Sequence, residues 1–328
     1  MKGYVGLFVA SLLPVAAFAH SKWFAESMLL PYQPTEPTGL YLMMWGMVAV
    51  VMVGVGYYWQ QHKLFQLAWL KPNADHVYDR SAATFAMVVG AFLLIAGTHN
   101  YLFSPNLVPG LGVPPFFIII QILIGLAFLV GVATRTAAMA LVLLWVASLY
   151  TNGLITAIEN IWVLSTAIFI AIMGNDYFSL LGKSFFKKKL EHFKPYALAV
   201  LRLGTGATLF TLGFSEKIFA PEYGINFLTH YHWNFMAHLG FNFSDYLFVI
   251  SAGAAESLFG LIFILGIVTR LNALVVAIFF TIPMFILGPI ELAGHIPHFA
   301  AVLLLLLYGN GGKFVIVRKY KDAEWGGE

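Results

Sequence analysis

The sequence predicts an all-α membrane protein with two parallel four-helix transmembrane bundles and one additional N-terminal transmembrane helix. The 328 residues are 60% hydrophobic and only 10% charged, and their mean hydropathy is +0.82. Several apolar stretches approach the roughly 20 residues that a helix needs to cross a bilayer. Two halves of the chain also share a pattern of residues at the same spacing, which indicates an internal repeat.

Residues 1–19 predict a secretory signal peptide, with Lys2 as its positive start and Ala-Phe-Ala at 17–19 as its cleavage site. Cleavage would make His20 the new N-terminus. The alternative is an uncleaved signal anchor. A polar segment outside the membrane is expected at 20–39 and the additional transmembrane helix at 40–60.

Nine spans are expected in the mature protein from the hydrophobic runs. They lie near 40–58, 82–97, 116–132, 137–149, 161–173, 198–214, 246–268, 273–287 and 296–308. Lys and Arg fall almost entirely in alternate loops, and such loops face the cytoplasm. This bias predicts a bacterial inner-membrane protein whose mature N-terminus lies outside and whose C-terminal tail, 313–328, is cytoplasmic. Arg202, near the inner end of its span, is expected to extend to the membrane surface.

The two predicted bundles are residues 81–182 and residues 195–312, joined by a basic linker at 183–194. The segment Gln121–Arg135 aligns without a gap with Glu256–Arg270. Four spans in each half give both halves the same orientation in the membrane, so the repeats are parallel.

The second half resembles the DoxX family of four-helix membrane proteins. The resemblance covers residues 196–312 well and 81–182 more weakly. It rests on the ordered elements Leu201-Arg202-Leu203, Gly213 with Glu216-Lys217, Glu256-x-x-x-Gly260, Gly266-x-x-Thr269-Arg270 and Gly309-Asn310-Gly311-Gly312. Members are similar to the small subunit of a thiosulfate:quinone oxidoreductase, and others are linked to redox or detoxification complexes. The resemblance therefore implies a quinone as cofactor. The first half departs from the pattern, since Gln121 replaces the acid.

Acidic residues within the second half are the predicted catalytic groups. Glu256 lies about midway along its span, where a carboxylate is costly and normally faces a partner, water or a ligand. Glu216 ends the preceding span on the outer side, and Lys217 and Trp233 are the predicted cofactor contacts. Adjacent helical residues do not face each other, so one of Glu216 and Lys217 is expected to turn inward and the other to meet water. The alternative for Glu256 is a structural hydrogen bond between helices.

Histidines gather on the predicted outer side and form a candidate metal site. Imidazole and carboxylate ligands suit Zn, Cu or Fe, although aromatic rings and histidines are also common at membrane interfaces. The motif His230-x-His232 would place both rings on one side of an extended strand. Pro297 is expected in the first turn of a helix that carries the later ligands. The full predicted set is His20, His230, His232, His238, Glu291, His295 and His298.

Three functions remain open from the sequence. The first is a subunit of a quinone-linked redox system that faces the periplasm and meets a periplasmic redox partner. The second is a metal-binding or metal-translocating protein that uses the outer histidines, and the third is a non-catalytic membrane scaffold. The chain has no cysteine, which excludes thiolate chemistry in this chain, and no Walker loop or dinucleotide fingerprint. The lipid bilayer is an expected partner and nucleic acid is not.

Overall fold

The computed structural model describes residues 32–317, except for 73, 106, 181–185 and 288. Over these ranges the protein is helical and forms no strand, which confirms the all-α prediction. The predicted signal peptide and the C-terminal end of the tail lie outside the described residues. The principal helices are α2 (Thr38–Gln61), α3 (Asp75–Thr98), α4 (Pro115–Val130), α5 (Thr134–Asn152), α6 (Leu154–Glu159), α7 (Ile161–Met173), α9 (Lys194–Leu212), α10 (Pro221–Tyr231), α12 (Asp245–Leu265), α13 (Thr269–Leu287) and α14 (Pro289–Tyr308).

Within the described ranges, five helical stretches are long and apolar enough to cross a membrane. They are Thr38–Gln61, His76–Thr98, Thr134–Asn152, Lys187–Ile218 and Asp245–Leu265. Four shorter apolar helical stretches lie at Pro115–Val130, Ile161–Met173, Thr269–Ile282 and Gly294–Tyr308. Each of the nine predicted spans therefore coincides with an apolar helix, while the number of helices that cross the membrane stays a prediction.

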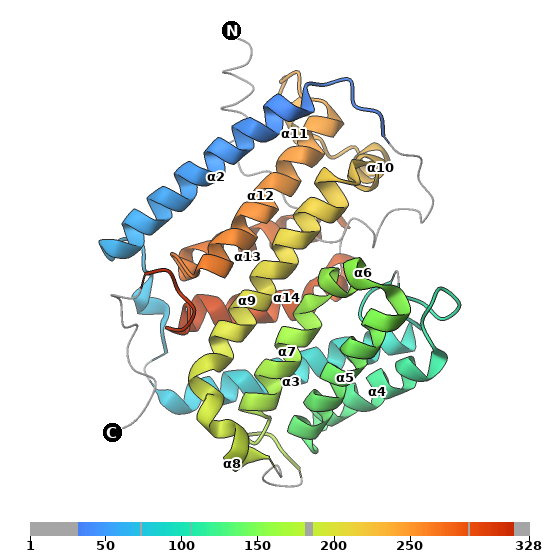
Figure 1. The fold of residues 1–328 in the computed structure, drawn as a ribbon, viewed down its shortest axis with the longest axis vertical. Helices are drawn as coiled ribbons and strands as arrows, with labels where there is room; N and C mark the ends of the chain where they lie inside the picture. Colours follow the sequence, from blue (N-terminus) through green and yellow to red (C-terminus); the bar gives the residue numbers. More distant parts are fainter. Residues whose placement is uncertain (1–31, 73, 106, 181–185, 288, 318–328) are drawn as a thin grey trace.

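Helix α9 lies near the centre of the molecule (Figure 1), packed against α12 and α7 and in contact with α14. Helix α3 packs against α4 and α14, and α5 packs against α7. The last helix of each predicted half thus lies against the first helix of the other half. Helix α2 runs along α12 at the edge of the molecule, and most of its surface is exposed.

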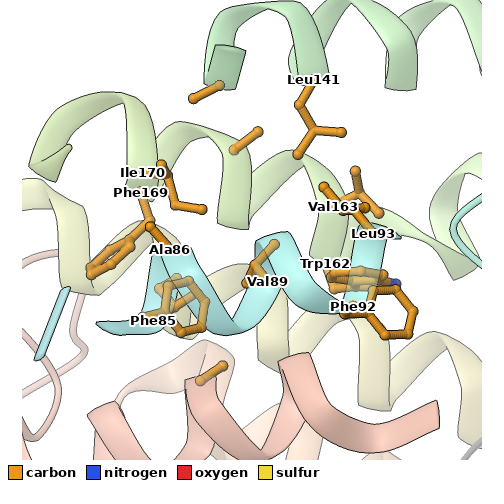
Figure 2. Packing of buried hydrophobic residues seen from close by; sticks show 14 of the residues in the cluster. Phe85, Ala86, Val89, Phe92, Leu93, Leu141, Trp162, Val163, Phe169 and Ile170 are labelled. Carbon is orange, nitrogen blue, oxygen red and sulfur yellow. The ribbon is translucent and has the colours of Figure 1, made fainter. Parts of the chain in front are cut away.

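Aromatic side chains fill the interface between α3 and α7 (Figure 2). Phe85 packs edge-on against Phe169 with ring centroids 5.3 Å apart, and Phe92 packs in the same way against Trp162 at 5.5 Å. The smaller Val89 lies between them on α3 and is fully buried. Aromatic pairs in this geometry add stabilisation beyond the apolar area that they bury.

Glycines bring α3 against α4 and α9 against α12 in the same way. A Cβ atom at Gly90 would lie 2.7 Å from the Gly125 carbonyl oxygen, and a Cβ at Gly206 would lie 2.7 Å from that of Gly260. The reciprocal distances are 2.8 Å and 2.5 Å. Side chains are excluded from both crossings because the backbones touch, as is common where small residues face each other in membrane helices.

Arg202 anchors the end of α12, and its predicted extension to the membrane surface is wrong. The side chain is 0% exposed. One guanidinium nitrogen donates to the Phe263 carbonyl at 2.8 Å, and the other donates to the carbonyls of Lys313 and Phe314, both at 2.9 Å. The last carbonyls of a helix have no partner within the helix, so a buried guanidinium can satisfy them.

Asp176, which follows α7, is held by two cations. Arg135 donates to its carboxylate at 2.8 Å, and Lys187 lies 3.3 Å from it. Burial by itself would raise the pKa of this carboxyl, but the hydrogen bonds and charges of Arg135 and Lys187 outweigh burial and hold the pKa below its ordinary value. The ion pairs thus connect the start of α5 and the short helix α8 (Lys187–Leu190) to the end of α7.

We expect Gly206→Ala to lower the thermal stability of the detergent-solubilised protein by about 1–3 kcal/mol, because the new methyl group would overlap the backbone of α12. Gly46→Ala on α2 is the matched control, since a Cβ there meets nothing within 4 Å. The control should be neutral or slightly stabilising because alanine favours a helix over glycine. Equal effects of the two substitutions would contradict the close crossing.

Low pH should lower the stability of the folded protein because Asp176 becomes protonated. Because its folded pKa is lowered, the carboxylate contributes stability that is present above about pH 3.9 and is lost as the pH falls below that value. We expect Asp176→Asn to cost about 1–3 kcal/mol at neutral pH and to remove this part of the acid dependence in thermal unfolding. Asp79→Asn, which breaks an exposed pair with Lys194, should change stability less.

Candidate functional site

The site begins where α9 continues into a π-helix, η4 (Gly213–Ile218). Beyond its end, the Phe219 amide donates to the Phe214 carbonyl five residues earlier, at 2.8 Å. Gly213 allows close contact with α12, because a Cβ there would lie 2.4 Å from the Gly253 carbonyl oxygen. Single π-turns interrupt α-helices most often at functional sites.

Lys217 on η4 and Glu256 on α12 form a buried ion pair. The lysine Nζ donates to Glu256 Oε2, and each of the two side chains is 1% exposed. The other oxygen, Glu256 Oε1, is buried and has no hydrogen-bond partner among the described residues. Each charge compensates the other, because an isolated ion at this depth would carry a desolvation penalty of several kcal/mol.

Glu216 is also buried, at 2% exposure. The prediction that one of Glu216 and Lys217 meets water is therefore wrong. A π-helix changes the angle between successive residues, and α10 packs over η4, so both side chains are covered. The site thus holds two buried acids and one buried base.

The corresponding place in the first half is neutral. Gln121 is fully buried, and its Nε2 donates to the carbonyls of Leu93 and Tyr101 at 3.2 and 3.1 Å. Its Oε1 accepts from the Phe103 amide at 3.0 Å. Residues 96–105 align with residues 212–221, which places Tyr101 opposite Lys217. An amide and a backbone carbonyl therefore occupy the place of the ion pair.

Trp233 lies just after α10, in the segment that leads to α12. It is half-buried and lies against Phe227 of α10, with ring centroids 6.4 Å apart. The neighbouring Asn234 donates to the Phe243 carbonyl and to Asp245, both at 2.8 Å, and so ties this loop to the start of α12. The role of Trp233 as a cofactor contact stays a prediction.

His230 and His232 are exposed at the end of α10. The expected extended strand is wrong, because His230 lies in the last helical turn and His232 follows it in the left-handed conformation, with φ of 51°. Pro221 in the first turn and the helical run after it favour a helix here. The two rings therefore do not share the face of a strand.

His295 and His298 lie together inside the protein, one turn apart on α14. Their ring centroids are 6.5 Å apart, and Phe280 of α13 and Trp162 of α7 each pack 5.3 Å from one of them. The placement of Pro297 in the first helical turn is wrong, because α14 begins at Pro289 and Pro297 lies inside it. The expected helical spacing of the two histidines is present.

The remaining metal candidates cannot be placed. His20 lies outside the described residues, as do the side chains of His238 and Glu291. Among the described residues, no group of three or more His, Asp or Glu side chains lies close enough to hold a metal ion. The metal site stays a prediction.

The partnership between Lys217 and Glu256 was not expected from the sequence. The two residues are 39 positions apart, and the sequence predicts Lys217 as a cofactor contact. Charge balance was the available signal, since a glutamate at mid-membrane depth needs a nearby cation and Lys217 ends the preceding span.

Comparison with known proteins gave one family match. The DoxX family model matches residues 197–289, from the first turn of α9 to the first residue of α14. This segment includes the π-helix, Lys217 and Glu256. No curated protein and no solved structure matched the chain. The chain thus has the apolar helices of a multi-pass membrane protein, and its residues 197–289 are similar to the DoxX family.

Proposed function

We propose that this protein is a membrane subunit of a periplasm-facing, quinone-linked redox system, in which the Lys217–Glu256 pair handles a proton of the quinol. The buried ion pair carries this proposal. Its two side chains are almost completely shielded and meet midway along a helix of membrane-spanning length. Ionisable groups in such positions are costly and commonly mark proton or ion pathways.

Glu256 supplies the proton acceptor. A quinol supplies two electrons and two protons when it is oxidised. Glu256 Oε1 is a buried acceptor without a hydrogen-bond partner among the described residues, so it fits the hydroxyl group of such a molecule. Lys217 donates to the other oxygen, Oε2, so the lysine charge compensates the charge of the carboxylate. General-base action of this kind requires a carboxylate within hydrogen-bond reach of the proton.

Glu216 provides the next acceptor along η4. Protons taken up at Glu256 pass through Glu216 towards the outer face, and electrons pass to a soluble periplasmic redox protein. The match to DoxX supports a redox role by analogy with the family alone.

We also infer that the two halves are parallel repeats and that the N-terminal end of α2 faces the periplasm. The matching glycine crossings support the repeat. Hydrogen bonds bring the start of α2 to the start of α12 through Thr38 and Tyr246, and the end of α2 to the start of α13 through Gln60 and Val268. Lys63 follows the end of α2 and Arg270 lies at the start of α13, as expected for a cytoplasmic face.

The ion pair can be tested by a double-mutant cycle. Glu256→Gln and Lys217→Met should each cost about 3–5 kcal/mol, because each leaves one charge buried without its partner. The double variant removes both charges, as in the neutral first half, and should be more stable than either single variant. Thermal unfolding in detergent measures all four proteins. Additive losses would contradict a coupled pair.

The proposed function can be tested with ferricyanide as an electron acceptor outside vesicles that contain the protein. One quinol then reduces two ferricyanide ions, and two protons are released. The wild type should support this reaction above the rate of empty vesicles. The folded Lys217→Met/Glu256→Gln variant should be at least about a hundredfold slower, because general-base catalysis contributes that much or more.

Glu191→Gln is the matched control for this assay. Glu191 is an exposed carboxylate in the linker, so its change to an amide should leave the rate unchanged. Wild-type rates in the Lys217→Met/Glu256→Gln variant, or no rate above empty vesicles in the wild type, would reject the proposal and favour a scaffold.

A further inference from the structure

A cavity of about 280 Å³ lies between α2 and the bundle. Its walls come from three helices and are almost entirely apolar. Val55 and Met52 line it from α2, Leu258 and Ile262 from α12, and Val275 from α13. Trp45 lies at one end and Trp59 at the other. These tryptophans are 14 residues apart, so the cavity follows α2 for about 21 Å at 1.5 Å per residue.

Hydrogen bonds connect both ends of helix α2 to the bundle, and the cavity lies between these two ends. At the start, Thr38 hydrogen-bonds Tyr246 at 2.6 Å and Tyr41 hydrogen-bonds Ser251 at 2.9 Å. Near the end, the Val268 amide donates to Gln60 Oε1 at 2.9 Å. These hydrogen bonds fix both ends of α2 beside the cavity.

The apolar walls of the cavity favour a hydrocarbon ligand. Water needs two to four polar partners to occupy a cavity, and apolar cavities of this kind stay dry or bind apolar molecules. An empty groove would also leave its walls without dispersion contacts. The groove is long and runs with a membrane-spanning helix, so an extended chain fits it better than a compact ring.

The residues beyond Trp59 favour a negatively charged headgroup. His62 and Lys63 follow Trp59 within about one turn, and both are exposed. A tryptophan beside a cationic residue is typical of the level of the lipid headgroups. We propose that this groove binds one acyl chain of an anionic phospholipid, with the phosphate at the level of Lys63. This inference does not depend on the redox role.

The test uses purified protein that is reconstituted with phosphatidylglycerol and then washed in detergent. Native mass spectrometry should find about one phosphatidylglycerol retained per chain. Val55→Phe fills the groove and should lower retention at least about tenfold, since several buried methylene groups lose their contacts. Val51→Phe is the matched control, because Val51 is exposed one turn earlier on the same helix and should leave retention unchanged.

Two further measurements complete the test. Phosphatidylglycerol with brominated chains should quench tryptophan fluorescence in the wild type, and this quenching should decrease in the Trp45→Phe/Trp59→Phe variant. Lys63→Gln should abolish the preference for phosphatidylglycerol over phosphatidylcholine, while Lys188→Gln, which changes an exposed linker lysine, should not. Equal retention by the Val55 and Val51 variants, no retained lipid, or retention of a quinone in place of phospholipid would overturn the proposal.

Discussion

The ion pair between Lys217 and Glu256 is the constraint on which the centre of the second half depends. Two charges without access to water need each other, so η4 and α12 must stay within hydrogen-bond reach. That approach is possible because Gly213 and Gly253 bring the two backbones together. The π-helix then turns Lys217 towards α12 and covers Glu216 as well. The glycines, the π-helix and the ion pair therefore act as one unit.

The first predicted half packs its helices without a buried ion pair at the position that aligns with Glu256. Its helices cross at Gly90 and Gly125 as closely as α9 and α12 cross at Gly206 and Gly260. Gln121 stands where the second half has its glutamate, and three hydrogen bonds to the backbone satisfy it. A neutral amide is thus a workable solution at this position. The costly charged pair in the second half is better explained by chemistry than by packing, which is why the proposed proton site is placed there.

The last helix of each predicted half packs against the first helix of the other half, and these contacts join the two halves. Helix α7 rests on α9, and α14 rests on α3, so neither predicted half buries its last helix alone. Trp162 and His298 meet at this junction, with Phe280 of α13 beside them. Buried imidazoles there are part of a packed aromatic layer between the halves. Helix α2 lies outside this junction, and its buried Tyr41 and Trp45 pack with residues of α12.

The sequence by itself determined the all-α class, the position of each apolar helix and the DoxX resemblance of the second half. These features follow from local hydrophobicity and from residues at fixed spacing, which a sequence displays directly. It also predicted Glu256 as a site residue, because a carboxylate at mid-membrane depth is rare and costly.

The tertiary structure alone decided which groups meet. It paired Glu256 with Lys217, buried Glu216, and turned Arg202 inward to the carbonyls at the end of α12. It also replaced the expected strand at His230 by a helix and moved Pro297 to a helix interior. Such outcomes depend on helix rotation, on a π-turn and on contacts between residues far apart in the chain. Hydrophobic periodicity describes each helix separately. It therefore carries no information on helix rotation, on π-turns or on contacts between distant residues.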